Sequence, residues 1–256
     1  MDNGLRYISL SHLNDYDKIG LEELNLIDLS VREDTKFIFH EDSLVSVLNQ
    51  LKPFYNILSI NNEHLFKYHT TYYDTKEYLF YKQHQNGNKK RFKIRKRRYN
   101  SVSEVFFEIK IKNNKNKTIK ERFIIEGSIN DLSAEIKKLT LETIGISIGQ
   151  LEPSLTVNYD RIALVDKNSK ERITIDMGLN VKNVFGSKNF NKLIIAEVKQ
   201  SRYNSSSKLI KILRKFKACE TRFSKYCIGL SQTNKNLKYN RFKPQLLLLD
   251  KIINSK

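Results

Sequence analysis

The chain has 256 residues, of which 46 are Lys or Arg and 28 are Asp or Glu, so its formal net charge is +18. Such an excess favours a polyanionic partner: nucleic acid, a phosphate polymer, nucleotides or an acidic membrane face. The sequence has no N-terminal signal pattern and no apolar run that approaches the length of a membrane span. We therefore expect a cytoplasmic protein without a membrane span.

The length allows one large domain, or at most two. Residues 1–33 mix short apolar pairs with Asp, Glu, Asn and Ser, which predicts an extension on the outside of a domain that runs from 34 to 256. Residues 35–39 (TKFIF) predict a strand. The helix predicted after this strand has an apolar stripe of Leu44, Val47, Leu48 and Leu51.

Residues 91–112 (RFKIRKRRYNSVSEVFFEIKIK) predict two strands joined by a turn near Asn100. Alternate side chains of a strand point to opposite faces. One face of this hairpin therefore carries Arg91, Lys93, Arg95, Arg97, Glu108, Lys110 and Lys112. An edge hairpin with a solvated polar face would explain the pattern. A polyanion lying along the charged row would also explain it, because cations in register repel one another.

The remaining strands show the same division into a charged face and an apolar face. They are predicted at residues 65–74, 118–125, 155–165, 172–176, 193–200 and 225–230. About eight such strands can close into a barrel without edges. Buried like charges are costly unless they are compensated. We therefore predict an α+β fold, an antiparallel β-barrel tunnel of about eight strands with helices outside and a watery, cationic lumen.

Two further helices are predicted in the second half of the chain. One runs to about residue 145 and is capped by Asn130 or Asp131. The other, at 205–218, is basic and amphipathic. Such a helix can bind a membrane surface, but packing on its own domain is the more common arrangement. Cys219 and Cys227 lack a zinc-type spacing with His and are expected to be buried free thiols.

Several segments together resemble the VTC domain of polyphosphate polymerases, a branch of the triphosphate tunnel metalloenzymes. The resemblance covers residues 36–230 and depends on the order and spacing of motifs that are individually weak. These motifs are YHTTYYDT (68–75), YKQHQNGNKKRFKIRKRRY (81–99), FFEIKIK (106–112), TIKERF (118–123), YDRIAL (159–164), RITID (172–176), IAEVKQ (195–200) and FSKYCIG (223–229).

The resemblance, together with the charged strand faces, assigns site residues by position. The catalytic group is Lys93, Arg95, Arg97, Lys110, Arg161, Arg172 and Lys225. The substrate-binding group is Lys36, Arg91, Lys112, Lys120, Arg122, Tyr159 and Lys199. Glu197 resembles the metal-binding glutamate, although an ion pair with Lys199 or an arginine would also explain it. Asp34 stands where many members have Glu, which puts a contact made by the longer side chain in doubt.

The implied activity is transfer of the γ-phosphate of ATP to a growing polyphosphate chain, with Mn²⁺ or Mg²⁺ as the cofactor. ATP and polyphosphate would be the partners, and no specific nucleic acid is expected because no nucleic-acid module is recognisable. Hydrolysis of triphosphate and non-catalytic binding of polyphosphate are the alternatives. The five histidines, His69 and His84 among them, are expected to be packing or surface residues.

Overall fold

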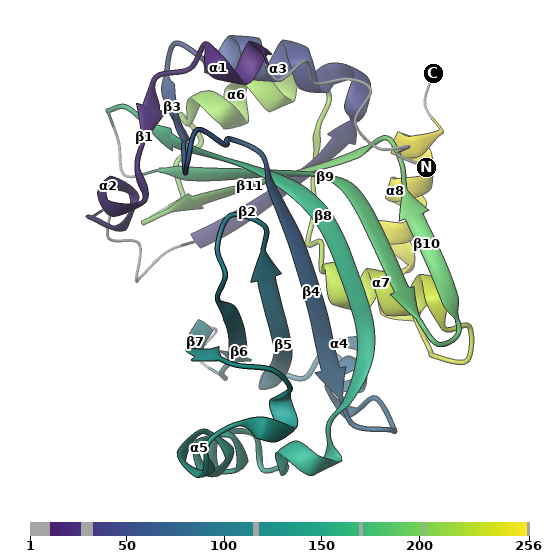
Figure 1. Ribbon diagram of the computed structural model, residues 1–256. Coiled ribbons are helices and arrows are strands. Elements are labelled where there is room, and N and C mark those ends of the chain that lie inside the picture. Colours follow the sequence, from purple (N-terminus) through teal and green to yellow (C-terminus); the bar gives the residue numbers. More distant parts are fainter. Residues whose placement is uncertain (1–10, 27–32, 115–117, 169–170, 202, 255–256) are drawn as a thin grey trace.

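The computed structural model describes residues 11–26, 33–114, 118–168, 171–201 and 203–254 (Figure 1). The strands are β1 (Lys18–Ile19), β2 (Glu33–His40), β3 (Tyr55–Leu58), β4 (Phe66–Asp74), β5 (Arg91–Tyr99), β6 (Val105–Lys112), β7 (Thr118–Ile125), β8 (Glu152–Asp166), β9 (Arg172–Asn183), β10 (Gly186–Phe190), β11 (Leu193–Gln200) and β12 (Cys219–Glu220). The α-helices are α1 (Ser11–Asn14), α2 (Leu21–Leu26), α3 (Leu44–Leu51), α4 (Leu79–Gln85), α5 (Ala134–Ile144), α6 (Lys208–Lys215), α7 (Lys225–Thr233) and α8 (Lys243–Ile253). The predicted α+β class is confirmed.

All strands belong to one 12-stranded sheet, whose main path is β12-β2-β11-β9-β8-β4-β5-β6-β7. Along this path every neighbouring pair is antiparallel. Figure 1 shows β4 to β7 descending steeply from the layer of β2, β11 and β9, while the long strand β8 belongs to both parts. The sheet thus bends around a concave face.

The predicted closure into a barrel is wrong for the part of the chain that the structure describes, because β7 and β12 are not paired with each other. β12 has only two residues and pairs with β2, and β7 pairs only with β6. The main path of the sheet therefore ends in two separate edges within the described residues. The alternation of side chains predicts which face of each strand is charged, but it does not predict whether the last strands meet.

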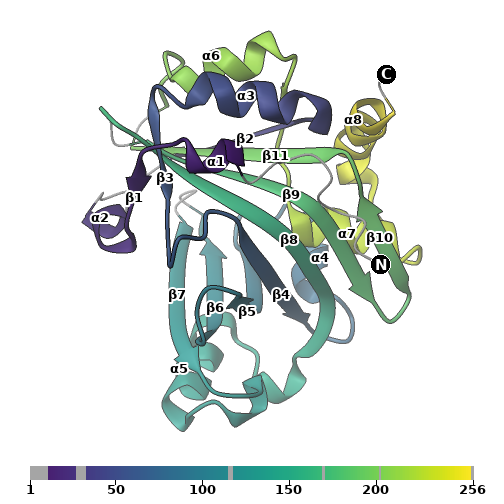
Figure 2. The ribbon, with the colours of Figure 1, turned by 45° about the horizontal axis from the view of Figure 1, so that its top comes forward.

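The outer face of the upper layer is covered by α3 and α6, which lie side by side above it (Figure 2). The predicted stripe of α3 is buried, and so are Leu209 and Leu213 of α6. Burying one such side chain contributes roughly 1.5–3 kcal/mol. Leu13 and Tyr16 join the same core, and the Tyr16 hydroxyl donates a hydrogen bond to the Leu48 carbonyl. The cations of α6 thus lie on the solvent side of a helix packed on its own domain.

The apolar faces of β5 and β6 form a separate core with α5. Phe92, Ile94, Phe107 and Ile109 are all buried there. Because alternate residues face opposite ways, the basic rows of these strands point to the concave side of the sheet. The hairpin is therefore not a free edge hairpin with a solvated face: its charged row faces the inside of the bent sheet.

The predicted strand at 225–230 is wrong, because this segment is the helix α7. The Ser224 side chain accepts a hydrogen bond from the Cys227 N–H and caps the helix. Almost every side of α7 is buried, and a Cβ added to Gly229 would lie 2.6 Å from Leu155. A short apolar run that is buried on all sides lacks the alternation of polar and apolar residues that distinguishes a helix from a strand.

The helix α5 is capped by Ser133, not by Asn130 or Asp131. Asp131 instead belongs to a short 3₁₀ helix, η2 (Ile129–Asp131), which has its own capping box with Ser128. Both cysteines are free: Cys227 is buried as predicted, and Cys219 is half-buried. No helix within the described ranges is long and apolar enough to cross a membrane.

Candidate phosphate-binding site

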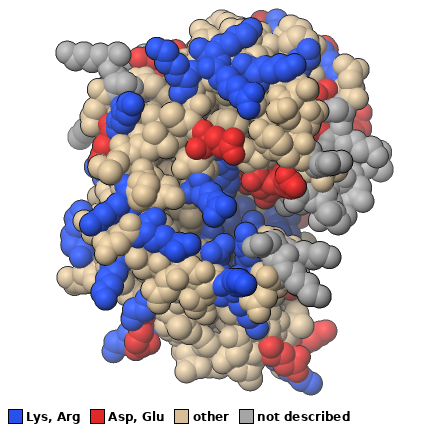
Figure 3. Space-filling view, turned by 180° about the vertical axis from the view of Figure 1, so that it is seen from behind, with Lys and Arg blue, Asp and Glu red and all other residues tan. Residues whose placement is uncertain are grey.

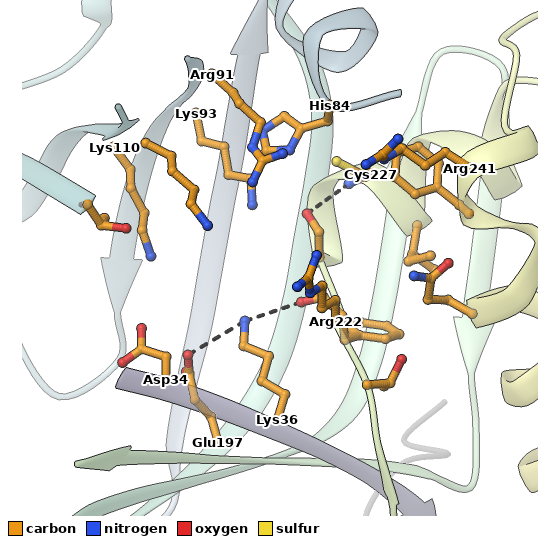
Figure 4. A pocket seen from close by; sticks show the side chains of 18 of the residues that line it. Asp34, Lys36, His84, Arg91, Lys93, Lys110, Glu197, Arg222, Cys227 and Arg241 are labelled. Carbon is orange, nitrogen blue, oxygen red and sulfur yellow. Dashed lines mark hydrogen bonds and ion pairs between the residues drawn. The ribbon is translucent and has the colours of Figure 1, made fainter. Parts of the chain in front are cut away.

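The concave face of the sheet holds a pocket of about 680 Å³. Seen from behind, Lys and Arg gather around a hollow of the molecule (Figure 3). The predicted site residues that line the pocket are Lys36, Arg91, Lys93, Lys110, Lys112 and Glu197. They come from β2, β5, β6 and β11, and Figure 4 shows the charged ends of Lys36, Lys93 and Lys110 pointing into one space. Segments far apart in the sequence thus contribute to one strongly basic pocket.

Lys93 and Lys110 are directly opposite each other on β5 and β6. No acidic group among the described residues lies within ion-pair distance of either ammonium group. Burial lowers the pKa of Lys110 to about 8, with Lys93 and Lys36 adding to the effect. Burial also lowers the pKa of Lys93. This pair is therefore short of negative charge and suited to a bound anion.

Glu108, whose side chain is only 1% exposed, neutralises the cations on the neighbouring strands. Its Oε2 lies 2.5 Å from Arg95 Nε and 3.7 Å from Arg97 Nη1, and its Oε1 lies 2.6 Å from Lys120 Nζ and 2.9 Å from Arg122 Nε. Burial by itself raises the pKa of Glu108, but these cations outweigh it and hold the pKa well below its usual range. One carboxylate thus fixes four predicted site residues.

Asp176 plays the same part for Arg161 and Lys225. Arg161 donates to both carboxylate oxygens, at 2.5 and 2.8 Å, and Lys225 also donates to Oδ2. Burial alone would raise the pKa of Asp176, but Arg161 and Lys225 lower it to about 2. Lys225 stands at the start of α7, so this contact joins the helix to the sheet.

Aromatic rings hold the guanidinium groups in place. Tyr68 and Tyr159 stack with their centroids 4.9 Å apart, and Tyr159 is buried. Arg161 lies 4.8 Å and Arg97 5.4 Å from the centroid of the Tyr68 ring. Because cations over aromatic faces are attracted to the ring quadrupole, Tyr68 links the Glu108 group to the Asp176 group. The predicted residues Arg97, Tyr159 and Arg161 thus lie together.

Glu197 forms ion pairs with two predicted site residues. Its Oε2 lies 3.2 Å from Lys199 Nζ and its Oε1 lies 3.5 Å from Lys36 Nζ. Burial favours the neutral acid, but Lys199 and Lys36 outweigh it and lower the pKa of Glu197 well below its usual range. The ion-pair interpretation therefore describes the protein without a metal, and the metal role stays a prediction.

Arg172 is placed differently from the other predicted cations. It does not line the pocket, and its Nη2 donates to the Leu24 carbonyl of α2. The structure therefore brings Arg172 to the N-terminal segment, while Arg161 is directed at Asp176.

A family model described as the VTC domain matches residues 31–234 of this chain. The chain belongs to the VTC domain family. No curated protein matches it. Among solved structures, a putative adenylyl cyclase of Hippeastrum, described as having a dominant triphosphatase activity, shares 14% identity with a TM-score of 0.52 over 78% of this chain and 95% of the other.

Two other solved structures resemble this VTC domain. A putative adenylate cyclase of Bacillus halodurans shares 13% identity, with a TM-score of 0.48 over 76% of this chain and 95% of that one. The PH1819 protein of Pyrococcus horikoshii OT3 shares 16%, with a TM-score of 0.43 over 77% and 97%. The likeness to the Hippeastrum protein shows a shared fold, and membership of the VTC domain family supports an enzyme of the triphosphate tunnel type.

The donor set of this VTC domain fits a divalent metal that is shared with a substrate. Asp34 and Glu197 both present carboxylates to the pocket (Figure 4). Among the described residues there is no group of three or more His, Cys, Asp or Glu side chains that could hold a metal ion alone. Mg²⁺ is commonly bound through one or two carboxylates together with substrate phosphates and water. Asp34 and Glu197 are therefore the residues that would hold such an ion.

The structure adds pocket residues that the sequence did not single out. Arg222 and Arg241 line the pocket together with His84. Burial, with Lys93 and Arg91, lowers the pKa of His84 to about 2, so its imidazole is neutral. Arg222 precedes the FSKY motif and could have been suspected from it, whereas Arg241 lies beyond every motif. His69 Nδ1 lies 2.7 Å from Asn158 Oδ1, which accepts its hydrogen bond, and His69 does not line this pocket.

Proposed function

We propose that this protein is an ATP-dependent polyphosphate polymerase. The observation that carries the proposal is the row of Arg91, Lys93, Arg95 and Arg97 on one face of β5, opposite Lys110 and Lys112 of β6. Six residues of a strand span about 20 Å. The row therefore extends beyond what the three phosphates of one nucleotide can contact, which supports a longer polyanion as the second ligand.

The reaction needs positioning and stabilisation of charge, since the protein takes little covalent part in phosphoryl transfer. The bond from the γ-phosphorus to the β,γ-bridging oxygen breaks, a terminal oxygen of polyphosphate bonds to that phosphorus, and ADP leaves. Lys93 and Lys110 are the cations available to bind the γ-phosphoryl group that is transferred. Arg95 and Arg161 are oriented by Glu108 and Asp176, so their remaining N–H groups would bind phosphate oxygens from fixed positions.

Glu197 and Asp34 would hold a divalent ion, Mn²⁺ or Mg²⁺. When bound, such an ion offsets negative charge that develops on the phosphate oxygens. Lys36 and Lys199 now neutralise Glu197. Both lysines would remain beside the phosphates to bind their outer oxygens. Because Asp34 is one methylene shorter than Glu, Glu197 is expected to be the main protein ligand.

Hydrolysis of triphosphate is the second candidate, and the fold shared with the Hippeastrum protein favours it. The same cations would bind the substrate, and water would replace the polyphosphate oxygen as the acceptor. A binding module without turnover would use the same pocket. Nucleic acid is less well supported, because the cations that line the pocket come singly from several separate strands and loops.

The test is incubation of the purified protein with ATP, Mn²⁺ and a short polyphosphate primer. Chain length is followed on a gel, while ADP and orthophosphate are quantified. Growth of the chain with one ADP per added unit is expected. Orthophosphate release without growth would indicate the triphosphatase, and the absence of turnover with any divalent metal would indicate the binding module. Long polyphosphate should displace bound nucleotide where single-stranded DNA does not.

A further inference from the structure

Three arginines from separate segments gather at the end of the pocket that lies away from Lys110. Arg91 begins β5, Arg222 precedes α7, and Arg241 lies in the short helix η4 (Asn240–Phe242). Figure 4 shows Arg241 and Lys110 on opposite sides of the pocket. The family match ends at residue 234, so Arg241 comes from a part of the chain that the VTC model does not cover.

These cations disfavour one another's charge. Burial lowers the pKa of Arg91, and Arg241 and Arg222 add to the effect. Burial also lowers the pKa of Lys112, again with a contribution from Arg91 and Arg222. Glu220 lines the same pocket, yet none of the described acidic groups forms an ion pair with these four cations. Unpaired cations that line one pocket are stabilised when an anion binds between them.

The position of Arg241 is built into the fold. Its guanidinium lies over the turn that leads from α4 into β5, where a Cβ on Gly87 would come within 2.5 Å of Nη1 and 2.7 Å of Cζ. Gly87 also has a φ of +74°, which disfavours any other residue. The turn before the basic strand therefore has no side chain at the place where Arg241 lies.

Two buried nitrogen atoms at this end have no hydrogen-bond partner within the described part of the chain. They are Arg91 Nε and His84 Nε2. Figure 4 shows the His84 ring beside Arg91, and Arg91 is among the groups that lower the pKa of His84. Because buried polar groups in folded proteins are nearly always hydrogen-bonded, the Arg91 Nε–H donor points to an anionic ligand that binds here, whereas the Nε2 of the neutral His84 ring can only accept.

We propose that Arg91, Arg222 and Arg241 form a separate phosphate subsite, which binds units of polyphosphate beyond those held at Lys93 and Lys110. Naming polyphosphate as the ligand rests on the proposed function. Guanidinium groups bind phosphate oxygens through two parallel N–H donors. Arg91 and Lys93 are two residues apart on one strand face, about 7 Å, so one flexible polyanion can contact both.

A nucleobase is the other ligand that this end could accept, because Phe223 and Phe242 also line the pocket. A purine, however, carries no negative charge and would leave the arginines uncompensated. The unpartnered donor on Arg91 and the mutual repulsion of the cations both favour an anion. The experiment therefore compares ligands with and without a base.

The test is the substitution Arg241→Ala, at an exposed position. Dissociation constants are measured by calorimetry for inorganic tripolyphosphate, long-chain polyphosphate and ATP, in chelator and at several salt concentrations. Long-chain polyphosphate should bind roughly 10-fold to 100-fold more weakly, as for the loss of one charged hydrogen bond. Tripolyphosphate and ATP should change less than about 2-fold, and the salt slope for the long chain should fall by about one.

Lys243→Ala is the matched control, because it removes one positive charge from the same segment. Lys243 is exposed and its Nζ lies 5.8 Å from the centroid of the Tyr239 ring, outside the pocket lining. It should leave all three dissociation constants unchanged. Gly87→Ala, which displaces the Arg241 guanidinium, should reproduce the loss seen for long-chain polyphosphate.

The subsite is excluded if Arg241→Ala weakens all three ligands equally, if the loss is confined to ATP, or if no ligand is affected. An equal loss of affinity for all three ligands would place Arg241 at the binding site of the central triphosphate. A loss of affinity for ATP alone would indicate a binding site for the nucleobase. Since binding is measured without turnover, a selective loss for the long chain would support the subsite even if the protein did not elongate polyphosphate.

Discussion

Lys93 of β5 and Lys110 of β6 are paired at opposite positions of these neighbouring strands, and both ammonium groups point into the same pocket (Figure 4). Like charges at opposite positions of neighbouring strands destabilise a sheet. The fold nevertheless holds them there because the apolar sides of the same strands are buried in the core with Ile94 and Ile109. A polyanion that enters the pocket relieves this repulsion. The relief contributes favourably to the free energy of binding.

The first prediction is that binding of tripolyphosphate weakens as the pH rises above about 8. The pKa of Lys110 is lowered to about 8, so this lysine loses its charge from there upward in the free protein. A bound anion favours the charged form, and binding above pH 8 must therefore take up a proton. Calorimetry at pH 7 and pH 9.5, in buffers of different ionisation enthalpy, measures both the affinity and the proton uptake.

Lys110→Arg is the matched variant for this pH dependence. Arginine stays charged throughout the range, so the variant should bind with little change between the two pH values. Lys110→Ala should bind roughly 10-fold to 100-fold more weakly at pH 7, as expected for the loss of one charged hydrogen bond of about 1.5–3 kcal/mol. If the decline with pH is the same in Lys110→Arg as in the original chain, another group titrates.

Most of the strands were predictable because one side of each is buried and the other is not. In β5 the alternation of Phe92 and Ile94 with charged residues specifies both the strand and its face. The segment of α7 could not be assigned in the same way, since it is buried on nearly every side and has no polar stripe. The open edges depend on the pairing of β7 and β12, which no local pattern encodes.

The members of the candidate site were predictable from the motifs, but their pairing was not. Glu108 gathers cations from β5 and β7, and which of them it neutralises depends on the cross-strand register. Arg241 approaches the pocket only because the chain after α7 returns over Gly87. Such contacts join residues that are far apart in the sequence, so the spacing of residues along the chain does not predict them.

The second prediction concerns Glu108, whose removal should destabilise the fold. Glu108→Gln leaves Arg95 and Arg97 buried without a counter-charge, which costs about 3–5 kcal/mol for a broken buried pair. Lys120 and Arg122 are 38% and 40% exposed, so solvent screens their share. For a chain of this length the melting temperature should fall by roughly 6–20 °C.

The pH dependence of stability checks the sign of this effect. Because the pKa of Glu108 is lowered in the fold, its contribution is complete above its ordinary value of 4.5 and is lost as the pH falls below it. Asp176, whose pKa is about 2 in the fold against 3.8 ordinarily, adds a loss between those values. Glu108→Gln should therefore lose less stability than the original chain on acidification. Glu104→Gln, at an exposed position, is the control.

The third prediction separates two arginines that were assigned the same role. Arg161→Ala should weaken binding of tripolyphosphate by roughly 10-fold or more, because it removes a charged donor that Asp176 holds in the concave face. Arg172→Ala should change this affinity much less, and should instead loosen α2, whose Leu24 carbonyl accepts from Arg172. Calorimetry measures the first effect, and amide hydrogen exchange of residues 21–26 measures the second. Equal losses of affinity would return Arg172 to the binding site.

The last prediction is that Glu197→Gln abolishes metal-dependent turnover while tripolyphosphate still binds in chelator. The amide keeps the size of the side chain but removes the charge that a divalent ion needs, so the loss should be at least about 10-fold to 100-fold. Removing that charge also frees Lys36 and Lys199 from their ion pairs. Metal-free affinity for the polyanion should therefore stay equal or increase. Lys199→Ala serves as the comparison, since it breaks the ion pair and keeps the carboxylate, and its activity should still depend on Mn²⁺. Normal turnover of Glu197→Gln at limiting Mn²⁺ would leave Glu197 as a partner of the two lysines alone.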